Sequence, residues 1–298
     1  MALFLAMLGI IPQANSRVVS AKEKKAFIQE ELAWREKRDK EMRTPTSWLN
    51  IAGLYWLKEG VNRFGTSEEN SIKLPEDSAP PFAGNFLLNN GIVTLISEQG
   101  VELKVNGNDA DGSVLKGDDL GKPDVVELNE LRMWVIKRFD QYAIRLRNLN
   151  HIPFQNYIGL DFYPPKEKYK LLAEFHPFQE PKKVEVGTVI GKNTEMSSLG
   201  YVTFKIDGKA YRLDAFSGKP QTLFFIFGDE TNGKDTYEAS RFLDAEILES
   251  GKVVLNFNRA HNPPCAYTPH ATCPLPPPQN QLKISILAGE KKYPDSFH

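Results

Sequence analysis

Short runs of β-branched and aromatic residues, separated by Gly, Asn, Asp and Pro, fill the chain beyond Gly60. This rhythm is typical of an antiparallel β protein, in which each run forms a strand and each polar break forms a turn. Asn-Gly and Asp-Gly pairs mark turns most strongly, because both residues accept a positive φ at little cost. Such pairs include those at 90–91, 106–107, 207–208 and 232–233.

The runs themselves predict strands. Helical periodicity is weak among them, so the sequence predicts a mainly β fold, an antiparallel sandwich or barrel-like architecture made of two packed β halves. The clearest strand candidates are 131–139, 141–147, 222–227, 252–257 and 283–287.

One N-terminal helix is the exception, and we assign it to 17–44. Ser20 and Glu23 have the spacing of a capping box, which predicts that the helix begins there. Phe27 and Trp34 fall on one side and Ile28 and Leu32 on an adjacent side, so this apolar face is expected to dock on the rest of the protein.

Length and proline content suggest where the two halves meet. At 298 residues the chain exceeds the usual length of one domain. The stretch 151–168 has little periodicity and contains Pro153, Pro164 and Pro165. Its many aromatic residues indicate a packed connection between a first half, 45–150, and a second half, 169–298.

The first residues have the pattern of a signal peptide. The apolar run 2–11 is too short to span a bilayer, and Ala14-Asn15-Ser16 precedes a possible cleavage point at Arg17, although no Lys or Arg comes before it. We therefore expect 1–16 to be removed and the protein to be exported to the periplasm or the outside. No other run predicts a transmembrane span.

Charge and motifs exclude several classes of function. With 37 basic and 38 acidic residues the formal net charge is −1, which gives no electrostatic footprint for nucleic acid. No motif for a cofactor occurs, so none is predicted. The expected partner is a small molecule or a protein.

An acidic loop at 228–235 precedes two further candidates. Its oxygen-bearing side chains could bind calcium, but the distal Glu of a calcium loop is missing, and a solvated hairpin turn is the favoured interpretation. Tyr237 and Arg241 follow it. They are four residues apart, so they share one face on either a helix or a strand.

The segment 256–280 holds the least ordinary residues of the chain. Polar groups leave the end of a probable strand, and Pro263 and Pro264 then fix an extended backbone that cannot be regular sheet. Irregular loops at strand ends often carry binding residues. The predicted ligand-binding residues are therefore Tyr237, Arg241, Asn258, Arg259, His261 and Asn262.

Cys265 and Cys273 admit three interpretations. In an exported protein they most simply form a disulfide, which is our prediction. A zinc site would use His261, Cys265, His270 and Cys273, but this spacing is not a standard one and no metal is predicted. Free thiols, one of them a nucleophile, are the third alternative.

Three functional hypotheses follow for this segment. The favoured one is a binding module for a small ligand or a protein. A hydrolase-like enzyme would use Asp229 or Glu230 with His261, or Cys265, in a pocket beside 256–280. The third is purely structural, because Asn and Arg side chains near a Pro-rich crossing often satisfy backbone groups that lack ladder partners.

Two stretches resemble known families. Residues 63–107, with the Gly65 turn, SIKLP and VELKVNG, resemble a forkhead-associated domain. The phosphothreonine-binding residues of that family are absent, since Thr66 follows Gly65 and Ser78-Ala79-Pro80 stands at the second motif. The resemblance therefore implies the fold without phosphopeptide binding.

The chain from about Trp34 onward resembles DUF1684, a family of bacterial proteins of unknown function. SWLNIAGLYWLKEGVNRFG, YIGLDFYP, ETNGKDTYEASRFLD and the long stretch 253–293 carry the resemblance. It implies no activity and no catalytic residues. It also implies an aromatic residue in place of His261 and His270, which argues against a metal site shared by the family.

Overall fold

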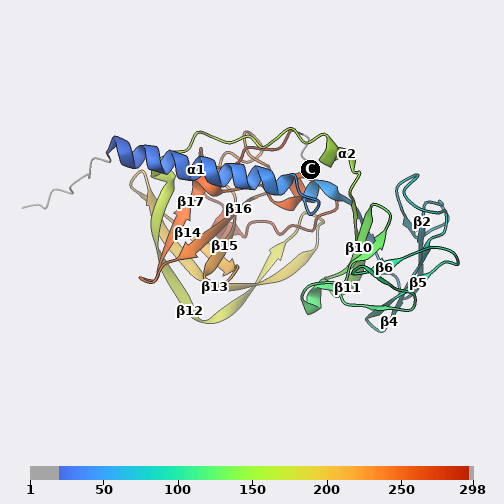
Figure 1. Ribbon diagram of the computed structural model, residues 1–298. Coiled ribbons are helices and arrows are strands. Elements are labelled where there is room, and N and C mark those ends of the chain that lie inside the picture. The colour runs from blue at the N-terminus through green and yellow to red at the C-terminus, as the bar shows by residue number, and fades with distance from the viewer. Residues whose placement is uncertain (1–19, 295–298) are drawn as a thin grey trace, which may run out of the picture.

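Helix α1, Ala21–Met42, lies along a β barrel, with a β sandwich at one end of the molecule (Figure 1). The computed structural model describes residues 20–294, so the predicted signal peptide, 1–16, lies outside the described residues. The capping box is present. The Glu23 amide donates to the Ser20 hydroxyl at 3.2 Å, and the Ser20 amide donates to the Glu23 carboxylate at 2.9 Å.

Two sheets form the sandwich between Ile51 and Asn148. Their strand orders are β1-β11-β10-β9-β6-β7 and β3-β2-β4-β5-β8, and every pair is antiparallel except β2 with β3. Phe64 stacks on Phe86 in the apolar layer between them. The strands are β1 Ile51–Trp56, β2 Gly60–Gly65, β3 Ile72–Lys73, β4 Gly84–Asn89, β5 Ile92–Ser97, β6 Lys104–Val105, β7 Asn108–Asp109, β8 Val114–Leu115, β9 Val126–Leu128, β10 Leu131–Arg138 and β11 Gln141–Asn148.

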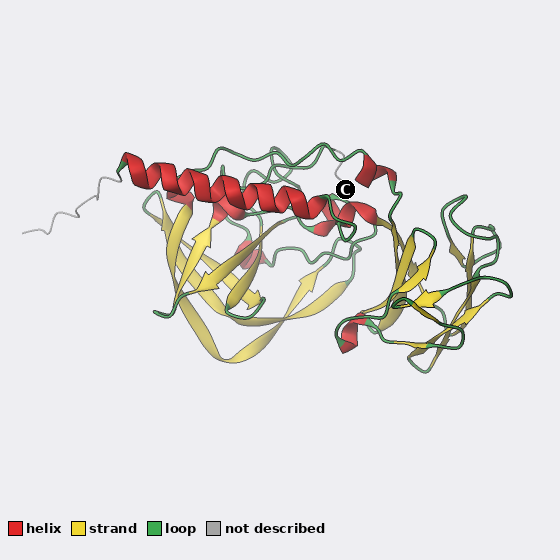
Figure 2. Ribbon diagram, in the orientation of Figure 1, coloured by secondary structure: helices red, strands yellow, loops and turns green. Residues whose placement is uncertain are grey.

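Six further strands close into a barrel in the order β12-β13-β14-β15-β16-β17. Alternate residues point inward and fill the barrel with an apolar core that includes Phe204, Phe225, Phe227 and Phe257. Figure 2 shows the two β assemblies joined by loops and by the short helix α2, Ile152–Gln155. The barrel strands are β12 Lys170–Gly187, β13 Asn193–Ile206, β14 Lys209–Ser217, β15 Thr222–Phe227, β16 Arg241–Ile247 and β17 Lys252–Asn256.

The mainly β prediction is confirmed, and so are three of the predicted hairpin turns. Asn90, Asn106 and Asp207 have φ of 49°, 52° and 49°, and each is followed by a glycine with positive φ. The pair at 232–233 does not join two paired strands. It lies inside the long loop between β15 and β16, where Asn232 forms a bridge with Thr236.

The strand predicted at 283–287 is wrong. These residues belong to an irregular segment in which the Ile284 amide donates to Leu282 O and the Ala288 amide to Ile286 O. Two carbonyl groups of the segment, those of Ile286 and Ala288, accept from the Arg241 guanidinium instead of from a neighbouring strand. The segment therefore packs on the barrel core without joining the sheet.

The docking face of α1 also differs from the prediction. Leu32 is 47% exposed, whereas Glu31 is 0% exposed. Phe27, Glu31, Trp34 and Arg38 follow the helical spacing of one face, so a carboxylate lies at the centre of the contact. The helix is therefore held to the barrel by polar groups as well as by apolar packing.

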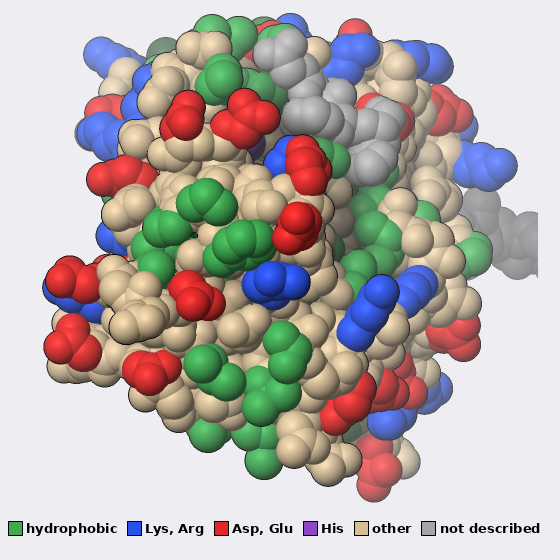
Figure 3. Space-filling model, turned by 90° about the vertical axis from the view of Figure 1, so that its right-hand side faces the viewer, with side chains coloured by type: hydrophobic (Ala, Val, Ile, Leu, Met, Phe, Trp, Pro, Cys, Tyr) green, Lys and Arg blue, Asp and Glu red, His purple; other side chains and the backbone are tan. Residues whose placement is uncertain are grey.

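The sandwich and the barrel meet through loops. The Thr268 hydroxyl donates to Ile51 O at 3.0 Å, and the His151 ring lies 2.7 Å from Leu49 O. The face shown in Figure 3 has hydrophobic groups among charged ones. The exposed hydrophobic residues include Val61 of β2 and Val114 of β8. In residues 20–294, no helix has the length and apolar character needed to cross a bilayer.

Candidate functional site

The predicted ligand-binding residues fall into two groups. Arg259 and His261 line a cavity between α1 and the outer wall of the barrel. The other four, Tyr237, Arg241, Asn258 and Asn262, are 0–2% exposed and are not among the lining residues. The structure therefore brings two of the six to one cavity.

This cavity, here called the α1 cavity, encloses about 560 Å³. Along β16, Asp244 and Glu246 alternate with the inward Leu243 and Ala245, so both carboxylates face outward. Helix α1 supplies one wall with Glu30, Trp34, Lys37, Arg38 and Glu41, and the barrel side supplies Lys170, Lys219, Thr222, Asp244, Ala245, Glu246, Val254, Asn256, Arg259 and His261.

A charged network forms part of the wall of the α1 cavity. Arg259 binds the Glu31 carboxylate with donor–acceptor distances of 3.2 and 3.1 Å and Glu30 at 2.6 Å. The side-chain amide of Asn256 donates to the Glu31 carboxylate at 2.8 Å. The hydrogen bond from Lys170 lowers the pKa of Glu30. Arg259 is therefore fixed by carboxylates of α1 while its side chain still lines the cavity.

A second network surrounds the buried carboxylate of Glu290. It accepts from Arg38 Nε at 2.8 Å, from the Tyr267 hydroxyl at 3.0 Å and from the backbone amide of Asn262 at 2.8 Å. Burial, reinforced by the nearby Glu290 charge, raises the pKa of Tyr267, which keeps its hydroxyl protonated and donating. This network ties α1 to the C-terminal segment.

His261 stands between these networks. Its backbone pairs with Phe242 in both directions at 2.9 Å, and its Nδ1 lies 3.3 Å from Arg259 O. Burial lowers the pKa of His261, and the positive charge of Arg38 lowers it further, while Glu290 and Asp244 oppose the shift. The imidazole is therefore neutral near pH 7 and can offer a ligand one donor or one acceptor.

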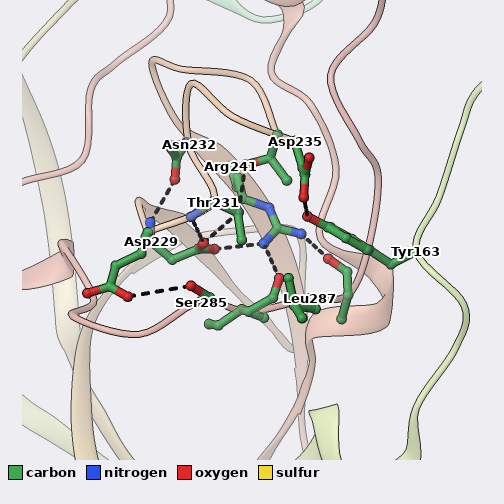
Figure 4. Close-up of polar contacts among 12 residues, drawn as sticks. Tyr163, Asp229, Thr231, Asn232, Asp235, Arg241, Ser285 and Leu287 are labelled. Carbon is green, nitrogen blue, oxygen red and sulfur yellow. Dashed lines mark hydrogen bonds and ion pairs between the residues drawn. The ribbon is translucent and has the colours of Figure 1, made fainter.

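Arg241 lies in a separate, buried polar cluster (Figure 4). Its guanidinium donates to Asp229 at 2.7 Å and to Ile286 O at 3.1 Å. Asp229 also accepts from the Thr231 amide at 2.8 Å and hydroxyl at 2.6 Å. The loop 228–235 was predicted to be a solvated turn, but Asp229 and Thr231 are buried: Asp229 binds this cation, and Thr231 donates to Asp229.

The remaining buried candidates satisfy backbone groups. Asn258 accepts from the Lys166 amide at 2.8 Å and donates to Lys166 O at 3.0 Å, and Asn262 donates to Lys291 O at 2.8 Å. Burial raises the pKa of Tyr237, which neighbours Cys265. Asn258 and Asn262 thus have the contacts expected of the structural hypothesis.

Neither the disulfide nor the zinc set is formed. Cys265 and Cys273 are free, and the Cys265 amide donates to Cys273 Sγ at 3.2 Å. His261 lines the α1 cavity, whereas both thiols are buried in an apolar cluster. Within the described part of the chain, no three His, Cys, Asp or Glu residues are placed to hold a metal ion.

The groups of the hydrolase hypothesis are not assembled around the α1 cavity. Asp229 is occupied by Arg241, Glu230 approaches Ser285 at 3.4 Å, and Cys265 is 0% exposed. None of these three residues lines the cavity that contains His261.

Sequence reasoning missed the contribution of α1. The predicted site does not include Glu30, Glu31 or Arg38, because the apolar residues of the helix define its predicted docking face. A signal was present, since Glu31 and Arg38 share the face of Phe27 and Trp34 at helical spacing. No sequence pattern of this kind marks Asp244 or Glu290 as part of the site.

Several solved structures are similar to parts of this chain. A solution NMR structure of an uncharacterized protein of Haloarcula marismortui is 30% identical, covers 46% of this chain and 78% of that one, and has a TM-score of 0.39. An FHA domain from a study of phosphothreonine-dependent interactions is 16% identical with a TM-score of 0.23, covering 32% of this chain and 92% of that one. The FHA domain of FhaA has the same identity and TM-score, with coverage of 32% and 97%.

No curated protein matches the sequence. The family model described as Protein of unknown function (DUF1684) matches residues 155–291. This range contains the barrel, Arg259, His261 and the cysteine pair, and it excludes the stretch 47–65 that was part of the predicted resemblance. Over residues 155–291, the chain belongs to the DUF1684 family.

Proposed function

We propose that this protein is an exported binding protein for a small polar ligand that occupies the α1 cavity. The observation that carries the proposal is the cavity itself, which encloses about 560 Å³ beside Arg259 and His261. Small-molecule sites have volumes of roughly 300–1,000 Å³ and combine apolar walls with a few convergent polar groups. Trp34 supplies an aromatic wall here, and His261 supplies a neutral imidazole.

The charges of the lining residues indicate what the ligand looks like. Arg38, Arg259, Lys170 and Glu30 already form ion pairs. Among the described residues, Lys37, Lys219, Glu41, Asp244 and Glu246 line the cavity without an ion pair. Unpaired charges of both signs favour a small zwitterion that carries an ammonium and a carboxylate group.

The predicted export supports the same assignment. The pattern in 1–16 predicts secretion, and a protein outside the cytoplasm would meet its ligand as a free solute. We therefore infer that the ligand is an amino acid or a short peptide from the surroundings of the cell.

Calorimetric titration with free amino acids and dipeptides tests the proposal. Asp244→Asn removes one cavity carboxylate and should weaken binding of the best compound by about 10-fold or more, because a charge-assisted contact contributes about 1.5–3 kcal/mol. Asp207→Asn is the matched control. Asp207 lies in the β13–β14 turn, where it pairs with Lys168, and it does not line the α1 cavity. Equal affinities of both variants, or no binding by the wild type to any compound, would reject the α1 cavity as the site.

A further inference from the structure

Arg145 is a buried cation whose side chain has no hydrogen-bond or ion-pair partner in the described part of the chain. It lies on β11, in register with Leu54 of β1 and Trp134 of β10, and it is 5% exposed. Among the described residues it forms no ion pair, and its buried Nε has no hydrogen-bond partner. Its guanidinium lies over the Trp48 ring, 5.4 Å from the centroid.

The groups around Arg145 are mostly positive. Asp118 is the carboxylate that interacts with it, but both Asp118 oxygens are already bound by Arg138, at 3.0 and 2.8 Å. Arg138 and Arg147 both repel the Arg145 charge. Burial, followed by the Arg138 charge, lowers the pKa of Arg145 to about 10, so it remains protonated at neutral pH.

The barrel half adds His270 and Cys273 to this junction. The His270 amide donates at 3.2 Å to the Thr268 hydroxyl, which donates to Ile51 O of β1, and Cys273 belongs to the apolar cluster against which Trp48 packs. Burial lowers the pKa of His270, and the charges of His151 and Arg145 lower it further. His151 has its Nδ1 beside Leu49 O. Cys273 cannot serve as the counter-ion, because burial raises the pKa of its thiol far above neutral pH.

A guanidinium has five donors, and burying it without an acceptor is costly. We propose that Arg145 and His270, with Trp48 as one wall, bind a small inorganic anion at the junction of the sandwich and the barrel. The low exposure of Arg145 excludes anions attached to bulky groups. Since the site is separate from the α1 cavity, it does not depend on the ligand proposed there.

The anion would also interact with the charge state of His270. A negative charge nearby favours the imidazolium form, and protonated His270 adds a second cation for the anion. Anion binding should therefore strengthen as the pH falls toward the pKa of His270. Arg138, Arg147 and His151 act in the same direction, while Asp118 opposes binding.

NMR titration of the imidazole groups tests the site in the full protein. The chain has five histidines, so their signals can be assigned individually. In 100 mM sodium chloride the pKa of His270 should be higher by ~0.5 or more than in 100 mM sodium gluconate. His176, exposed on β12, is the internal reference for general effects of the two salts.

Two variants distinguish anion binding at Arg145 from a general effect of salt. Arg145→Met should abolish the chloride dependence of His270, whereas Arg147→Met, which removes a neighbouring arginine bound to Thr46 O, should keep it. Chloride-35 line broadening on the wild type gives a second readout that needs no variant. Identical His270 titration in chloride, sulfate, phosphate and gluconate would overturn the proposal and leave water as the partner of Arg145.

Discussion

Arg241 on β16 and Asp229 in the loop after β15 form an ion pair of 2.7 Å in which the side chains are 1% and 0% exposed. The same guanidinium binds carbonyl groups of Ile286 and Ala288, and it lies 5.3 Å from the centroid of Phe227. One buried cation thus joins a barrel strand, a loop and the C-terminal segment.

Removal of either partner should destabilise the protein strongly. Arg241→Met leaves Asp229 as an uncompensated buried charge, and we expect a loss of about 3–5 kcal/mol in the free energy of unfolding. Urea denaturation measures this loss. Glu195→Gln breaks the exposed pair with Lys183 and should leave the unfolding midpoint unchanged. Similar midpoints for both variants would contradict the role assigned to Arg241.

Gly289 should tolerate no side chain. Its φ is +83°, and an added Cβ would collide with Ala260 O and lie 2.7 Å from Arg241 Nη2 and 2.8 Å from Phe257 O. Gly289→Ala should cost at least about 2 kcal/mol, because backbone strain and a clash with backbone atoms add together. Gly251 has a similar φ of +76° with open space around it. Gly251→Ala should therefore cost only about 1 kcal/mol by the same denaturation assay.

The free energy of unfolding should decrease below neutral pH, because His261 is harder to protonate in the folded protein than in the unfolded chain. Its pKa in the folded protein is below the reference value of 6.5, so the unfolded chain binds more protons as the pH falls. The stabilisation is present above pH 6.5 and is lost as the pH falls through the folded pKa. One such group changes the free energy of unfolding by up to about 1.4 kcal/mol per pH unit.

Urea midpoints between pH 5 and 7.5 check this dependence. His261→Gln should flatten the pH profile, and the added substitution His270→Gln should flatten it further, because burial also lowers the pKa of His270. The control is His176→Gln on the exposed surface of β12. A His261→Gln profile as steep as that of the wild type would show that His261 is not the titrating group.

Both cysteines should behave as buried free thiols. Cys265 is 0% exposed and Cys273 is 5% exposed. We expect almost no reaction with a thiol reagent in the native state and two reactive thiols per chain in guanidinium chloride without reductant. Fewer than two thiols after unfolding would instead support the disulfide that the sequence predicted for an exported protein.

Local features of this fold could be predicted from the sequence. The start of α1 depends on Ser20 and Glu23, three residues apart, and the turns at Asn90, Asn106 and Asp207 depend on two adjacent residues that accept positive φ. The same reasoning mispredicted a strand at 283–287, because its alternation is real but the Ile286 carbonyl accepts from Arg241 and the Ile284 carbonyl from the Glu230 amide in a loop.

The α1 cavity could not be predicted in this way. Arg259 and Glu31 are 228 positions apart, yet they share two hydrogen bonds. Asn258 and Arg259 are adjacent in the sequence, and one is buried against Lys166 while the other lines the cavity. The sequence by itself determined the helix start, three hairpin turns and the strands β10, β11, β15 and β17, because these depend on interactions between near neighbours. Only the tertiary structure decided which polar side chains became buried partners and which line a cavity, because that depends on how α1 and the C-terminal segment pack around the closed barrel.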